Sequence, residues 1–214
     1  MNKRYEILDG LPTYGDMAVP IVSDSEVFVS EGYVVKFYKD NGSTWIANFP
    51  QGLGSLSFVK SIPNNNSILV VAGGDGYLMN PNHTKPIQEF NYFADTMVER
   101  DNGRLILASL TDIMFLDENA EIEWETGRVS WDGIKDLKLE GNILTGYAYD
   151  VGMYDENNDD NAWVKFTIDL ETKEIEGGCN FSVLEVSEKK LGWKYWIIFI
   201  LIVSIFQIFI HSLK

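Results

Sequence analysis

The chain has 214 residues, with 17 Lys and Arg against 32 Asp and Glu and a formal net charge of −15. All of the acids lie in residues 1–188, where thirteen cations leave a net charge of 13 − 32 = −19. A surface this negative repels phosphate backbones, so we exclude direct nucleic-acid binding, and it admits a basic protein or peptide as a partner. The plainer alternative is that the charge only keeps the domain soluble.

The first twelve residues contain no apolar run of the about seven residues that a secretory signal peptide needs. Cys179 is the single cysteine of the chain, so no intrachain disulfide can form, as is typical of a reducing compartment. We therefore predict that residues 1–188 form one cytoplasmic domain.

Short runs of Val, Ile, Tyr, Phe and Trp separated by Asn, Asp and Gly dominate this domain, and helical periodicity is nearly absent. The pattern predicts an all-β fold of antiparallel strands. Its clearest hairpin spans 33–49, with a turn at Asn41-Gly42, two residue types that tolerate positive φ. The stretch Asp40-Asn41-Gly42-Ser43-Thr44-Trp45 resembles the Asp-box of sialidase-type propellers, a turn that joins the outer two strands of a blade, although Tyr38 replaces the motif's serine.

A repeat becomes visible in the later strands. Residues 67–81 align with 104–118 at an offset of 37, and 142–150 follow at a further 38. Repeats of this length that contain about four short strands predict propeller blades. Alternatives to a closed ring are a partial ring completed by a second chain and an irregular β-sandwich. We place four antiparallel meanders of a small propeller-like array at 18–50, 55–92, 95–127 and 133–178.

Two further turns resemble those of PQQ-like and related quinoprotein-type repeats. Phe115-Leu116-Asp117 leads to Trp124, and Ile168-Asp169 leads to Thr172 and Glu174. With the turn that resembles the Asp-box, they suggest a bacterial β-propeller-like repeat protein. Both resemblances are signatures of fold and imply no active-site residue.

Few residues of the domain favour catalysis. The glycine-rich stretch 73–76 lies between two strands, so we predict a hairpin turn; a phosphate cradle would need a helix after the loop. His83 is the one histidine before the C-terminal tail, and one imidazole makes no zinc site. We therefore predict no catalytic residue and no cofactor.

The fourth predicted blade holds the remaining candidates. Its insertion, 151–161, offers hard oxygen ligands that suit calcium, with a solvated acidic loop as the alternative. The weak calcium candidates are Asp155, Asn157, Asp159 and Asp160. A ligand pocket at the propeller axis would use Trp131, Asp132, Asp136 and Asp150. Burial of these acids, with raised pKa values, would favour catalysis, whereas exposed acids would favour an interaction surface.

The C-terminal tail predicts a membrane anchor. Residues 195–213 form an uncharged run of nineteen, thirteen of them Ile, Leu, Val or Phe, and a helix of that length spans about 28 Å of a bilayer core about 30 Å thick. Residues 189–194 form a basic and aromatic juxtamembrane segment, whose three lysines against Lys214 predict that the large domain is cytoplasmic. A helix buried in the fold or in an oligomer is the alternative. The predicted anchor residues are Trp193, Tyr195 and Trp196 at the interface and Ile197 to Ile210 in the lipid.

Together these features predict a membrane-tethered, non-enzymatic protein-interaction module on the cytoplasmic face. One specific form of it would mask a basic toxin by charge complementarity, an immunity-type role. The alternative is a membrane-attached enzyme or small-ligand sensor with its pocket at the propeller axis. A third hypothesis is that the chain mainly assembles homo-oligomers through its anchor and its edge strands.

Overall fold

A computed structural model describes residues 3–22, 30–153 and 162–179, and the chain divides into two units, residues 1–178 and 179–214. No helix within the described residues is both long enough and apolar enough to cross a bilayer. The predicted tail helix at 195–213 and its anchor residues lie outside the described residues. So do the four calcium candidates Asp155, Asn157, Asp159 and Asp160, and both predictions stay predictions.

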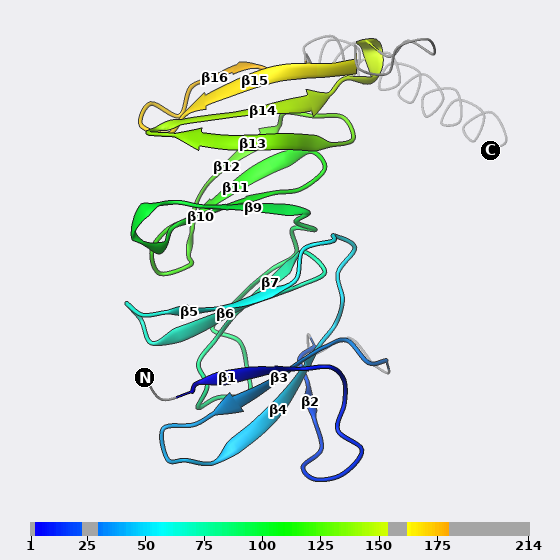
Figure 1. Cartoon of the computed structure of the whole chain (residues 1–214), viewed down its shortest axis with the longest axis vertical. Helices are drawn as coiled ribbons and strands as arrows, with labels where there is room; N and C mark the ends of the chain where they lie inside the picture. Colours follow the sequence, from blue (N-terminus) through cyan, green and yellow to red (C-terminus); the bar gives the residue numbers. More distant parts are fainter. Residues whose placement is uncertain (1–2, 23–29, 154–161, 180–214) are drawn as a thin grey trace, which may run out of the picture. The chain divides into compact units, whose positions relative to one another are not determined.

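Within the described residues of the first unit, sixteen strands form four sheets of four strands each (Figure 1). The first sheet contains β1 (Tyr5–Leu8), β2 (Val19–Pro20), β3 (Tyr33–Tyr38) and β4 (Thr44–Phe49). The second contains β5 (Phe58–Ile62), β6 (Ser67–Ala72), β7 (Asp75–Met79) and β8 (Gln88–Phe90). The third contains β9 (Thr96–Glu99), β10 (Leu105–Ala108), β11 (Asp112–Leu116) and β12 (Ile122–Arg128). The fourth contains β13 (Ile134–Glu140), β14 (Ile143–Tyr149), β15 (Trp163–Asp169) and β16 (Ile175–Gly177).

The all-β prediction is confirmed, and two short 3-10 turns, η1 (Asp101–Gly103) and η2 (Val151–Met153), are the helical elements among the described residues. The second, third and fourth sheets are antiparallel meanders whose strands neighbour one another in chain order, as predicted. The repeat is structural, because β7 and β11 begin 112 − 75 = 37 residues apart, and β10 and β14 begin 143 − 105 = 38 apart. The predicted insertion also falls where expected, between β14 and β15.

The first sheet departs from the prediction of a plain meander over 18–50. Its strand order is β1-β3-β4-β2, so β1 joins from outside the predicted bounds and β2 pairs in parallel with β4. The turn that resembles the Asp-box therefore joins the two middle strands of its sheet and not the outer two. Gly42 has φ of +83°, and the Asn41 side chain accepts a hydrogen bond from the Ser43 N–H at 3.0 Å. The turn thus spans five residues, 39–43, and uses Asn41 as a side-chain acceptor.

The core lies between neighbouring sheets. β6 and β7 are buried on both faces, which is why they read as nearly continuous apolar runs. On one face, Ile68 and Val70 pack against Phe37 and Phe49 of the first sheet. The opposite face carries Leu69, which packs in a cluster with residues of the third sheet. Full burial of one such side chain contributes roughly 1.5–3 kcal/mol, so these two clusters hold the first three sheets together.

Two tryptophans stack on phenylalanines within their own sheets. Trp45 stacks on its cross-strand partner Phe37 with ring centroids 4.9 Å apart, and its indole N–H donates to the Pro81 carbonyl at 2.7 Å. Trp124 likewise stacks on its cross-strand partner Phe115, with ring centroids 4.7 Å apart. The Trp45 bond ties the first sheet to the turn after β7.

The strand directions place three kinds of connection at one end of the sheets, which we call the loop end. It comprises the turns between the second and third strands of the meanders, the connectors from sheet to sheet, and the loop between β1 and β2. Backbone hydrogen bonds link neighbouring segments there: Gly54 N–H to Gly73 O at 2.8 Å, Ala94 N–H to Gly74 O at 3.0 Å, and Gly133 N–H to Leu110 O at 2.8 Å. The segments of the loop end are 9–18, 30–32, 50–57, 73–74, 91–95, 109–112, 128–133 and 150–153.

Candidate functional site

The loop end carries the most exposed apolar side chains of the described residues. Met17, Tyr14 and Leu53 are 91, 90 and 89% exposed. Single exposed apolar residues are ordinary on protein surfaces, but their concentration at one end of a fold is typical of a binding surface. Five more exposed apolar side chains belong to the same segments: Leu11, Phe93, Leu110, Val151 and Met153.

Acidic residues share this end with the apolar ones. Arg128 is the one cation in the described loop-end segments, and its guanidinium lies over the Trp131 ring, 5.1 Å from the ring centroid. The field around the protruding side chains is therefore negative. The acids of these segments are Asp9, Asp16, Glu31, Asp95, Asp112, Asp132 and Asp150.

A hollow of about 400 Å³ opens at the loop end between the second and third sheets. One wall is the connector 91–95, which contributes Tyr92, Phe93 and Asp95. The facing wall is the turn 109–112, and Leu53 of the preceding connector completes the lining. The hollow therefore combines apolar side chains with two carboxylates.

The phenol of Tyr92 is the unusual group of this hollow. Its hydroxyl oxygen is buried and makes no hydrogen bond with any described residue. Burial raises its pKa most strongly, and the charge of the neighbouring Asp112 carboxylate raises it further. An unsatisfied buried hydroxyl costs about 1–3 kcal/mol, so the native fold retains this group at an energetic cost.

The Tyr92 and Phe93 backbone is held by a buried carboxylate. Asp75 accepts hydrogen bonds from the N–H groups of Tyr92 at 3.0 Å and Phe93 at 3.4 Å. Burial raises the pKa of Asp75, and these two N–H donors lower it in part. Phe93 has φ of +56°, a conformation that is uncommon for a bulky residue, and its ring is 45% exposed. The constraint presents an aromatic ring at the rim of the hollow.

The facing turn is organised by Ser109. Its hydroxyl donates to the Asp112 carboxylate and accepts from the N–H groups of Thr111 and Asp112, each at 3.1 Å. With these bonds satisfied inside the turn, the Leu110 side chain projects outward and is 49% exposed.

The four pocket residues predicted from the sequence do not line this hollow. Trp131, Asp132 and Asp150 do come to the loop end, where the Trp131 N–H donates to Tyr149 O at 2.9 Å. Asp136 instead lies in β13, in an irregularity of the ladder between Lys135 and Lys138, with φ of +54°. Asp132 and Asp136 are exposed and Asp150 is half-buried, the distribution that favours an interaction surface over catalysis.

Sequence reasoning missed the residues of the hollow. The repeat offset of 37 aligns Asp112 with Asp75 in the sequence, and this alignment is the one signal that could have pointed to the hollow. Nothing in the local sequence marks Tyr92 or Phe93. Among the described residues, no three His, Cys, Asp or Glu side chains gather as metal ligands.

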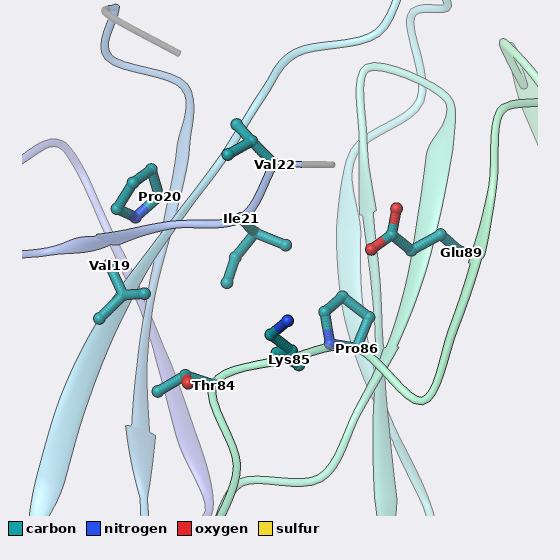
Figure 2. Close-up of a pocket in the computed structure, with 8 residues that line it drawn as sticks. All are labelled: Val19, Pro20, Ile21, Val22, Thr84, Lys85, Pro86 and Glu89. Carbon is teal, nitrogen blue, oxygen red and sulfur yellow. The ribbon is translucent and has the colours of Figure 1, made fainter. Parts of the chain in front are cut away.

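A second hollow, of about 420 Å³, lies between β2 and the segment 84–89 (Figure 2). Ile21 and Pro86 face the same space there, and Lys85 and Glu89 contribute charges of opposite sign. No single class of charged ligand is favoured by such a lining.

Comparisons with known proteins add little to this geometry. No protein-family model matches the sequence, and no curated protein matches it. A solved structure of a protein of unknown function from Bacteroides caccae is similar over 68% of this chain and 53% of its own, at 14% identity and a TM-score of 0.34. The chain thus spans about half the length of that neighbour, and a likeness of this degree supports no inference about function.

Proposed function

We propose that this protein is a membrane-tethered, non-enzymatic interaction module on the cytoplasmic face, and that its loop end binds a basic segment of a partner protein. The gathering of exposed apolar side chains and acids at that end is the observation that carries the proposal. Apolar contacts would supply most of the affinity, and the negative field would select the partner and speed its association.

The charge of the loop end narrows the class of partner. The described loop-end segments contain seven acids and one cation, and this net negative charge repels anionic lipid headgroups and nucleic acids. A segment that combines Lys or Arg with apolar residues satisfies both features of the surface. Cytoplasmic segments next to membrane spans have this composition, because Lys and Arg are enriched there.

The path of the chain after the fourth sheet supports the same class of partner, a basic segment next to a membrane span. The chain leaves the fourth sheet at Gly178, whose N–H donates to Lys165 O, and a Cβ on Gly178 would lie 3.0 Å from the Val129 carbonyl oxygen of the loop end. Residues 179–194 separate this point from the proposed span, and sixteen residues reach at most about 55 Å. The loop end would therefore stay within reach of juxtamembrane segments, where tethering raises the local concentration.

The finer architecture belongs to the same proposal. Four sheets packed in chain order suit a small propeller-like array, and each sheet would be one blade. A second copy that completes a ring remains a hypothesis, as does homo-oligomer assembly through the anchor.

A small-ligand sensor is the second candidate, and the hollow beside Tyr92 is the observation that favours it. Its position differs from the predicted pocket in the fourth sheet. Such a sensor would bind a free small molecule in the hollow without a protein partner.

Site-specific photocrosslinking tests the proposed function. A photoreactive phenylalanine analogue replaces Leu53 at the loop end, and in a matched control it replaces Ile122, which is 40% exposed at the opposite end of the sheets. The full chain is expressed in cells and irradiated, and the adducts are sequenced. We expect Leu53 adducts on Lys- and Arg-rich segments next to membrane spans, with few from Ile122. Equal yields from both positions, or adducts without basic residues, would contradict the proposal.

A further inference from the structure

We infer that the hollow between the second and third sheets is a pocket for one cationic side chain, a Lys or Arg that anchors the partner's segment. The inference rests on the proposed function and deepens it, because it names the group that the loop end would bind. It stands on three observations: the apolar walls, the pair of carboxylates, and the buried hydroxyl that has no partner.

The walls suit the aliphatic stem of a long basic side chain. Leu53 projects almost fully into solvent on one side, and the exposed Phe93 and Leu110 side chains lie on the others. Lys and Arg bury three or four methylene groups along such surfaces while the charged head reaches polar atoms. The Phe93 ring adds a face on which a guanidinium or ammonium can rest.

Two carboxylates, those of Asp95 and Asp112, supply hydrogen-bond acceptors in the hollow. Asp95 accepts from the Ser55 N–H at 2.8 Å and Asp112 accepts from Ser109, and neither carboxylate takes part in an ion pair among the described residues. Each carboxylate has a second oxygen and further lone pairs that can accept from a cation. A charged donor would form the strong, short class of hydrogen bond with them.

Five backbone N–H donors around the hollow are already engaged, which disfavours an anion. The N–H groups of Tyr92 and Phe93 donate to Asp75, and that of Asp95 donates to Ala108 O at 2.8 Å. Those of Thr111 and Asp112 donate to the Ser109 hydroxyl. A phosphate or carboxylate ligand would find few N–H groups there, whereas a cation finds open acceptors.

The Tyr92 hydroxyl completes the pocket. Its oxygen is buried in the wall of the hollow and has no hydrogen-bond partner among the described residues, although its residue is 92% shielded from solvent. In the proposed complex the phenolic oxygen accepts from the cation. Binding would thereby satisfy a group that is unsatisfied in the free protein.

The test uses n-butylguanidinium as the probe, with neutral n-butylurea as the control of matched shape. The full chain is titrated with each compound, and the backbone amide resonances of Phe93, Leu110 and Asp112 are followed by NMR. We expect saturable shifts with n-butylguanidinium only. The Asp112→Asn variant should bind the probe about tenfold more weakly, and Glu171→Gln, at an exposed acid of the opposite end of the sheets, within about twofold of the native chain.

The Tyr92→Phe variant separates binding from structure. It should bind n-butylguanidinium several-fold more weakly while its unfolding midpoint stays unchanged or rises, because the removed hydroxyl is unsatisfied in the free protein. Equal responses to the two probes, or native affinity in both Asp112→Asn and Tyr92→Phe, would overturn the inference. If Leu53 crosslinks to basic segments but the probe does not bind, the pocket fails and the function stands; the reverse pair of results would leave the pocket without the proposed function.

Discussion

In the second sheet, Gly73 and Gly74 form the turn before Asp75; in the third sheet, Leu110 and Thr111 occupy the equivalent turn before Asp112, thirty-seven residues later. The first turn is closely packed, since a Cβ on Gly74 would lie 2.3 Å from the Ala94 nitrogen. The second turn carries side chains and borders the hollow.

The two aspartates differ in the same way. Asp75 is buried and holds the Tyr92 and Phe93 amides of the next connector. In the third sheet the equivalent connector is held by a backbone group, because the Val129 and Ser130 N–H groups donate to Thr111 O at 2.8 and 3.0 Å. Asp112 is thereby released from that structural task and is left at the wall of the hollow. A repeat can thus keep one geometry while a single copy becomes available for binding.

The largest expected effect is at the packed turn. Gly74→Ala should lower the free energy of unfolding by about 3 kcal/mol, because the new methyl group meets backbone and the residue has φ of +83°. Thr111→Ala, at the equivalent position of the open turn, should lower it by less than about 1 kcal/mol. Chemical denaturation of both variants measures the difference. Similar losses in the two turns would contradict the contrast between them.

The second-largest effect on stability is expected from replacing the two aspartates. Asp75→Ala leaves two backbone N–H groups without their acceptor and should cost about 2–3 kcal/mol of unfolding free energy. Asp112→Ala removes a bond from the Ser109 hydroxyl and should cost about 1 kcal/mol. The two losses of unfolding free energy are obtained from the denaturant midpoints, with the dependence of that free energy on denaturant equal in both variants. A larger loss for Asp112→Ala would show that the third-sheet carboxylate is also structural.

Lowering the pH should reveal the raised pKa of Asp75 as a gain in stability. Its pKa in the folded chain is raised above 3.8, so between the two values the folded chain holds a proton that the unfolded chain releases. Its ionised form is therefore penalised at neutral pH, and this group adds stability as pH falls through the folded pKa, fully so below about 3.8. As the pH falls from about 7 to 4, the free energy of unfolding of the unmutated chain should rise relative to that of Asp75→Asn. Parallel curves would mean that the Asp75 pKa is not raised.

The smallest expected effect is a gain. Tyr92→Phe removes a buried hydroxyl without a partner and should raise the free energy of unfolding by about 1 kcal/mol. Tyr147→Phe, at an exposed tyrosine of β14, should change it by less than about 0.5 kcal/mol. Both are measured by denaturant unfolding. A loss of stability in Tyr92→Phe would show that the hydroxyl already has a partner.

The sequence predicted the repeated part of the fold well, because offsets of 37 and 38 and the Gly73-Gly74 turn are local signals. It did not predict the first sheet, where β1 joins β3 across a long loop and β2 pairs in parallel. Nor did it predict the hollow, since Tyr92 and Asp112 meet only through packing of two sheets. Three of the four predicted pocket residues lie at the loop end, whereas Asp136 lies within β13, where the ladder is irregular.

The most direct test of the central claim is to map where a basic, apolar ligand binds. The full chain is titrated with an amphipathic peptide of Leu and Lys, and the backbone amide shifts are recorded by NMR. The account predicts saturable shifts at the loop end, around Leu53, Phe93, Leu110 and Val151, which weaken as salt is added. Shifts confined to the opposite turns, around 117–121 and 141–142, or no saturable binding at all, would contradict it.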